Sequence, residues 1–161
     1  NIDKNKIEHV KKTLFGPGRV TFRKGQINSW QEEIPKDVQT IIEKAKSESI
    51  LRAVNDQVGS PTYTHDLASA IVTLIEKNAC GVVNITNVGS CTWYEFALQI
   101  FDSVGFSGIN IRPISSQSLG APARRPANSR LATDLFYKLT GTSLRSWQEA
   151  LKAYLKAYVS F

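Results

Sequence analysis

The sequence predicts an α/β fold, because short apolar segments typical of strands alternate with segments that carry apolar residues at helical spacing. Strands are expected at 50–54, 81–86 and 110–114, each short and containing Ile or Val. Because helices intervene, the strands at 50–54 and 110–114 are expected to lie side by side as a parallel pair joined by a crossover.

Helices are expected where apolar residues recur every three or four positions. Two of them begin at capping boxes, Thr92 to Glu95 and Ser146 to Glu149, whose hydroxyl and carboxylate satisfy free N–H groups at a helix start. The stripe after Thr92 is predicted to face the core and not to form a cofactor site. The stripes are Ile7, Val10 and Leu14; Val38, Ile41, Ile42 and Ala45; Leu67, Ile71, Leu74 and Ile75; Trp93, Phe96, Ala97, Ile100, Phe101 and Val104; and Trp147, Ala150, Leu151, Tyr154, Leu155 and Tyr158.

Three further features complete the chain. Residues 20–22 form a candidate strand, residues 115–129 a long polar loop, and a short helix from Asp134 is predicted to end at Gly141. No Met occurs anywhere, even at position 1, which indicates a fragment, a processed chain or an excised piece.

Composition narrows the class of protein. The net charge is +6 and 42% of residues are hydrophobic, enough for a packed core. No basic helix or aromatic-interleaved stripe indicates nucleic-acid binding, and no apolar run is long enough to span a membrane. Cys80 and Cys91 have neither metal-binding nor disulfide-framework spacing, so both are expected to be small buried residues of a cytoplasmic protein.

Several catalytic motifs are missing. No G-x-G-x-x-G loop follows a strand, and no Tyr has a Lys four residues later, so neither a dinucleotide cradle nor an acid for hydride transfer is evident. His9 and His65 stand alone, without ligands at metal spacing. Asp66, near a helix start, is interpreted as a residue favoured by the helix dipole and not as a catalyst.

Three motifs carry the functional signal. They are residues 55–63 (NDQVGSPTY), residues 92–97 (TWYEFA) and residues 123–129 (ARRPANS), and a Trp-x-x-Ala-Leu helix follows them. In this order, residues 50–161 resemble the C-terminal, substrate-binding half of dTDP-4-dehydrorhamnose reductases, which are extended short-chain dehydrogenases. The resemblance implies a partial Rossmann-like fold, mainly the substrate-binding lobe, here with a helical N-terminal extension.

The resemblance also implies a function and a site. The family reduces a 4-keto dTDP-sugar with NADPH, so this chain is expected to bind a sugar nucleotide and to hold no cofactor itself. Arginine can bind a diphosphate with two hydrogen bonds, and glycine lets backbone N–H groups approach it. The implied substrate-binding residues are Gln57, Gly59, Ser60, Pro61, Thr62, Arg124, Arg125 and Asn128.

Residues 1–49 form a basic segment that is predicted to be separate from 50–161. Its stretch Phe22 to Trp30 weakly resembles the C-terminal segment of sulfotransferases that use phosphoadenosine phosphosulfate. That resemblance implies binding of the cofactor's 3′-phosphate by Arg23, Lys24 and Gly25.

The leading hypothesis is a sugar-nucleotide-binding half of a reductase. The alternatives are a sulfotransferase fragment and a non-catalytic regulatory or interaction subunit. Apolar surfaces left uncovered by the missing half favour a homo-oligomer. The sequence leaves open whether the chain is a natural fusion, a truncation or an artefact, and which sugar nucleotide it prefers.

Overall fold

A computed structural model describes residues 36–47, 50–105, 110–119 and 125–158. The elements predicted at 3–14 and 20–22 lie outside these ranges. Strands β1 (Ile50–Val54) and β4 (Asn110–Ile114) pair in parallel, with Ile50 opposite Asn110 and Val54 opposite Ile114. The two strands and their predicted parallel pairing are therefore confirmed.

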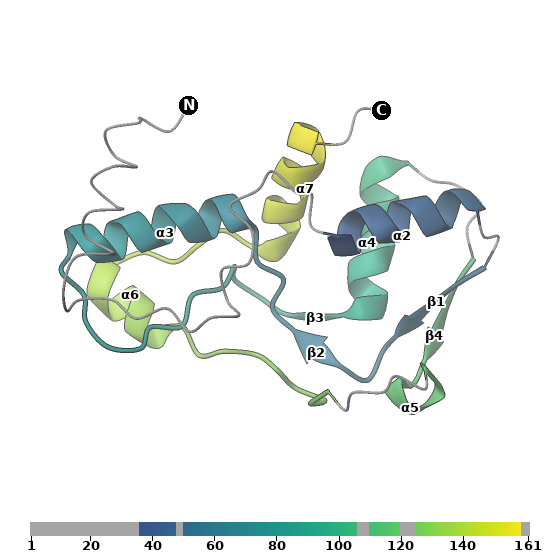
Figure 1. The fold of residues 1–161 in the computed structure, drawn as a ribbon, viewed down its shortest axis with the longest axis horizontal. Helices are drawn as coiled ribbons and strands as arrows, with labels where there is room; N and C mark the ends of the chain where they lie inside the picture. Colours follow the sequence, from purple (N-terminus) through teal and green to yellow (C-terminus); the bar gives the residue numbers. More distant parts are fainter. Residues whose placement is uncertain (1–35, 48–49, 106–109, 120–124, 159–161) are drawn as a thin grey trace.

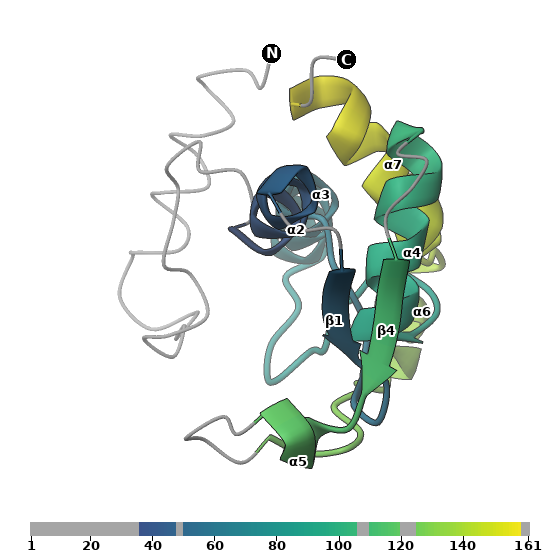
Figure 2. The same ribbon diagram turned by 90° about the vertical axis from the view of Figure 1, so that its right-hand side faces the viewer.

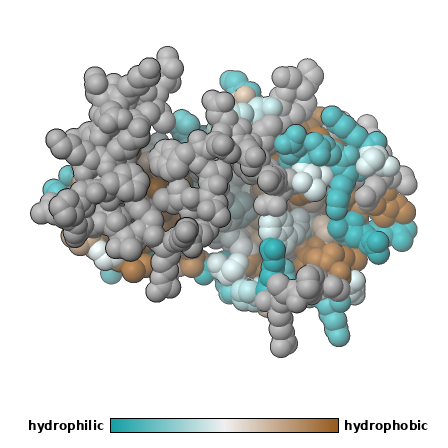
Figure 3. All heavy atoms as spheres, viewed as in Figure 1, coloured by the Kyte–Doolittle hydropathy of each residue, from teal (hydrophilic) through white to brown (hydrophobic). Residues whose placement is uncertain are grey.

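Two helices accompany this strand pair (Figure 2). Helix α2 (Lys36–Ser47) contacts β1 and α4, and α4 (Trp93–Val104) contacts both strands. Ala45 of α2, Leu51 of β1 and Ala97 and Phe101 of α4 form one buried cluster. The apolar stripe of α2 is thus part of the same core as the strands, and its outward face is hydrophilic (Figure 3).

The remaining helices are α3 (Thr64–Glu76), α5 (Ser116–Leu119), α6 (Asp134–Thr140) and α7 (Trp147–Tyr158). In Figure 1, α3 and α6 lie at one end of the molecule, the strand pair with α2 and α4 lies at the other, and α7 is between them. Helix α7 contacts α4, and α3 contacts α6. A second buried cluster joins α2, α4 and α7, and its member Ile100 is completely buried.

Local sequence explains where the helices begin and end. Both capping boxes form: Thr92 and Glu95 exchange side-chain and backbone hydrogen bonds, and Ser146 and Glu149 do the same. Helix α6 stops at Gly141, whose φ of 74° is a left-handed conformation that favours glycine. The predicted starts of these helices and the stop at Gly141 are confirmed.

Four expectations are wrong. Residues 81–86 form no strand in the described part of the chain, and Val82 is 88% exposed. Trp93 is 38% exposed because it stands in the first turn of α4, beyond the buried stripe. Cys80 is exposed, whereas Cys91 is buried as expected. The loop predicted at 115–129 contains α5, where the Asp56 carboxylate accepts hydrogen bonds from the Ser116 N–H and hydroxyl.

Two very short strands were not predicted. Strand β2 (Val58–Gly59) pairs antiparallel with β3 (Cys91–Thr92). Two-residue strands carry too little alternation to be recognised from sequence. Among the described helices, none is long and apolar enough to cross a membrane.

Ile100 tests the buried cluster. The Ile100 side chain has no exposed surface. Ile100→Ala should therefore lower the free energy of unfolding by about 3 kcal/mol, because it removes buried methyl groups and leaves a cavity. Leu98→Ala on the same helix is the control, because Leu98 is 42% exposed; its loss should be about 1 kcal/mol or less. Urea denaturation measures both, and equal losses would contradict the assignment of the core.

Candidate nucleotide-binding pocket

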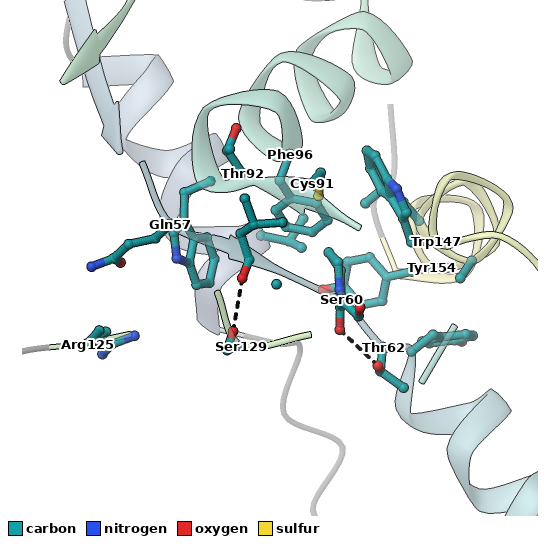
Figure 4. Close-up of a pocket in the computed structure, with 18 of the residues that line it drawn as sticks. Gln57, Ser60, Thr62, Cys91, Thr92, Phe96, Arg125, Ser129, Trp147 and Tyr154 are labelled. Atoms are coloured by element: carbon teal, nitrogen blue, oxygen red, sulfur yellow. Dashed lines mark hydrogen bonds between the residues drawn. The ribbon is translucent and has the colours of Figure 1, made fainter. Parts of the chain in front are cut away.

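A pocket of about 450 Å³ lies where β2, β3, α4, α7 and the segment after residue 125 meet (Figure 4). Its volume is in the range of small-molecule sites. Figure 4 shows Gln57, Ser129 and the Arg125 side chain toward one end, and Trp147 and Tyr154 toward the other, with Ser60 and Thr62 near Tyr154. Its lining includes Gln57, Gly59, Ser60, Pro61, Thr62, Trp93, Phe96, Arg125, Ser129, Trp147 and Tyr154.

The backbone of Val58 holds the polar end together. Its N–H donates to the Ala127 carbonyl at 2.8 Å, and its carbonyl accepts from the Ser129 N–H at 2.9 Å and the Ser129 hydroxyl at 3.1 Å. Gly59 packs so closely that an added Cβ would lie 3.2 Å from the Ser129 hydroxyl oxygen. The two predicted binding motifs, about 70 residues apart, therefore form one wall.

The following turn is fixed by a buried amide. Thr62 donates to the Ser60 carbonyl at 3.1 Å, and the Tyr63 N–H donates to Asn87 Oδ1 at 2.8 Å. Asn87 is fully buried, and its Nδ2 donates to Asp66 Oδ2 at 2.8 Å and to the Arg145 carbonyl at 3.1 Å. Because buried polar groups are costly without partners, this network locks the turn in place.

Asp66 completes the network as a structural carboxylate. Arg145 binds it with two hydrogen bonds, 2.8 Å from Nε to Oδ2 and 2.6 Å from Nη2 to Oδ1, and the guanidinium lies 5.7 Å from the centre of the Tyr63 ring. Burial acts to raise the pKa of Asp66, but the hydrogen bonds from Arg145 and Asn87 bring it below its ordinary 3.8. Its place in the first turn of α3 agrees with the predicted role.

Aromatic rings form another part of the pocket lining. The centre of the Phe96 ring lies 5.8 Å from the centre of the Trp147 ring and 6.3 Å from that of Trp93. The Tyr63 and Tyr154 rings meet edge-on, with 6.0 Å between their centres. The helical periodicity of the sequence places Trp93, Phe96, Trp147 and Tyr154 on apolar helix stripes. Periodicity cannot separate a core position from a pocket wall, so it missed the second role of these side chains.

The predicted site residues are only partly brought together. Gln57, Gly59, Ser60, Pro61, Thr62 and Arg125 line the pocket. Asn128 is not in the lining: its side-chain oxygen accepts from the N–H and Nε of Arg130, and Ser129 takes the lining position. Arg23, Lys24, Gly25 and Arg124 lie outside the described residues. No cluster of metal-binding side chains occurs in the part of the chain that the structure describes.

Comparison with known proteins identifies the family. The family model described as RmlD substrate binding domain matches residues 28–160. The chain belongs to this family. It is 38% identical over 119 residues to the spore coat polysaccharide biosynthesis protein SpsK of Bacillus subtilis, covering 74% of this chain and 41% of that protein. It is 33% identical over 132 residues to the dTDP-4-dehydrorhamnose reductase of Aggregatibacter actinomycetemcomitans, covering 75% and 45%.

A solved structure agrees with the RmlD substrate binding domain. The dTDP-4-dehydrorhamnose reductase of Bacillus anthracis, crystallised with NADP, superposes with a TM-score of 0.70 at 36% identity, covering 74% of this chain and 42% of that one. The fold is thus a mixed α/β portion of a Rossmann-like extended short-chain dehydrogenase fold. The chain spans about two fifths of the length of the curated relatives it matches.

The sulfotransferase resemblance is not supported. The RmlD substrate binding domain match begins at residue 28 and includes α2, whose apolar face packs into the shared core. Arg-Lys-Gly is a three-residue motif, short enough to arise by chance. The division of the chain between 49 and 50 stays a prediction, although the family match runs across it.

The Asp66–Arg145 pair makes stability depend on pH. A carboxyl group with a lowered folded pKa stabilises the protein above its unfolded pKa, and that contribution is lost as pH falls through the folded value. Asp66→Asn should therefore be less stable than wild type at pH 7, with a difference that shrinks as pH falls from 5 to 2. Arg145→Gln should behave alike. Thermal unfolding between pH 7 and pH 2 measures the stability difference between each variant and wild type. A stability difference that does not change with pH would contradict the Asp66–Arg145 pairing.

Proposed function

We propose that the chain forms the sugar-nucleotide-binding part of a dTDP-4-dehydrorhamnose reductase-like protein. The observation that carries this proposal is the meeting of residues 57–62 with residues 125–129 around one pocket. These are the segments that the family resemblance assigned to substrate binding, and the structure assembles them through hydrogen bonds that involve no ligand.

The two ends of the pocket differ in chemistry, and this supports a ligand with two chemical ends. Arg125 is exposed and has no hydrogen-bond or ion-pair partner among the described residues, so its guanidinium is available to an anion. A guanidinium binds phosphate through paired N–H groups. The aromatic rings at the far end offer stacking surfaces to a planar base. A nucleoside diphosphate has both features.

The whole protein would reduce a 4-keto sugar nucleotide with NADPH, as the relatives' names and the bound NADP of the Bacillus anthracis structure suggest. The residues present here do not fit that cofactor. The sequence has no G-x-G-x-x-G loop and no Tyr-x-x-x-Lys pair. We therefore assign this chain the binding and orientation of the substrate, and no step of hydride transfer.

Arg125 provides the direct test. Arg125→Ala should weaken dTDP binding roughly ten- to a hundredfold, because a charge-assisted hydrogen bond contributes about 1.5–3 kcal/mol. Arg130→Ala is the matched control, since Arg130 is an exposed arginine outside the pocket lining. Calorimetric titration at low and moderate salt measures both. Absence of dTDP binding to the wild type would reject the proposed function, and equal weakening by both variants would indicate a general charge effect.

The purified chain should not turn over substrate. With NADPH and a dTDP-4-keto sugar, we expect no loss of nicotinamide absorbance above the rate without protein, since no side chain is assigned to protonate the developing alkoxide. Added dTDP-4-keto sugar should still raise the melting temperature, because binding to the native state stabilises it. Measurable turnover would contradict the proposed division of roles.

A further inference from the structure

The hydroxyl group of Tyr154 is buried, and no hydrogen-bond partner for it lies in the part of the chain that the structure describes. The residue is 3% exposed, and its hydroxyl oxygen has no hydrogen bond among the described residues. The rings of Tyr63 and Tyr158 pack against the Tyr154 ring, with distances of 6.0 and 5.3 Å between ring centres. A buried hydroxyl without a hydrogen bond is unfavourable and rare in native proteins, so its presence requires an explanation.

The position of Tyr154 in the pocket explains why its hydroxyl has no partner among the described residues. Tyr154 lines the pocket and reaches from α7 toward the segment that contains Ser60 (Figure 4). Arg125 lies at the opposite end of the same pocket. A ligand whose anionic group contacts Arg125 and which extends along the pocket would bring its other end to the aromatic wall and to Tyr154.

The protonation state of Tyr154 suits hydrogen-bond donation. Burial, followed by the neighbouring Tyr158 and Tyr63 hydroxyls, raises the pKa of Tyr154 to about 12. The phenol therefore keeps its proton at neutral pH. A phenol hydroxyl can donate one hydrogen bond and also accept, which matches the carbonyl and N–H groups on the edge of a pyrimidine base.

We infer that the Tyr154 hydroxyl hydrogen-bonds the polar edge of the nucleobase when a sugar nucleotide occupies the pocket. The inference rests on the proposed function and adds to it a residue that recognises the base. Among the described residues this hydroxyl has no partner in the free protein, and the ligand supplies one. Such a group contributes to binding at the expense of the stability of the free protein.

Tyr154→Phe is the test, because it removes the hydroxyl and keeps the ring. We expect its affinity for dTDP to fall about two- to tenfold, the effect of one neutral hydrogen bond. The melting temperature of the free protein should stay the same or rise, because an unsatisfied polar atom is removed. Tyr137→Phe is the matched control: Tyr137 stands on α6, is 57% exposed and is not in the pocket lining. It should leave dTDP affinity unchanged.

A double-mutant cycle separates recognition of the base from a general disturbance. If Tyr154 and Arg125 contact different ends of dTDP, the fold-losses of Tyr154→Phe and Arg125→Ala should multiply in the double variant, within about twofold. A loss from Tyr154→Phe that disappears in the Arg125→Ala background would overturn the inference.

The remaining outcomes are equally decisive. Unchanged dTDP affinity in Tyr154→Phe, with normal binding by the wild type, would overturn this inference and leave the proposed function intact. A lower melting temperature of free Tyr154→Phe would show that the hydroxyl already has a partner in the free protein, and would also overturn it. Absence of dTDP binding to the wild type would reject both.

Discussion

The pocket depends on the hydrogen bonds of one residue, Val58. Its backbone pairs with β3 on one side and with the segment of Ala127 to Ser129 on the other, so three distant parts of the chain meet at a two-residue strand. Strands this short are marginal by themselves. They persist here because β3 leads directly into the capping box of α4, and α4 is anchored by its buried face. The hydrophobic core thus fixes the polar end of the pocket indirectly, through the start of one helix.

The second support is the buried amide of Asn87. It joins the turn before α3, the carboxylate of Asp66 and the backbone of Arg145 just before α7. Removing any member of such a network would leave its partners unsatisfied in a region of low dielectric, so the members stabilise one arrangement. That arrangement sets the position of Tyr63 and, through α7, of the aromatic wall. Core packing and a polar network therefore each position a different end of the site.

What the sequence predicts well is local. Both capping boxes, the apolar stripe of α2 and the stop at Gly141 depend on residues a few positions apart, and all are found. The stripe of α7 is buried as far as Leu155, whereas Tyr158 is 49% exposed. Residues 81–86 have strand-like composition, but a strand needs a partner backbone. In the described part of the chain these residues pair with no other strand, and the Asn84 side chain donates to the Ala132 carbonyl. The site shows the same limit. Motif matching located both loops, yet it chose Asn128 where Ser129 faces the pocket, because which neighbour faces inward depends on pairing with Val58.

The hydrogen-bonding side chains around the pocket fall into two sets, those bonded within the protein and those without a partner among the described residues. Ser129, Thr62 and Asn87 direct their side chains to protein carbonyls or backbone N–H groups and so build the walls. Arg125 and the Tyr154 hydroxyl have no partner among the described residues, and they stand at opposite ends of the pocket. A scaffold selected for stability alone would satisfy or remove a buried hydroxyl, since burial without a hydrogen bond costs about 1–3 kcal/mol. Unused hydrogen-bonding capacity at both ends of one cavity is therefore better explained by a ligand that bridges them than by packing.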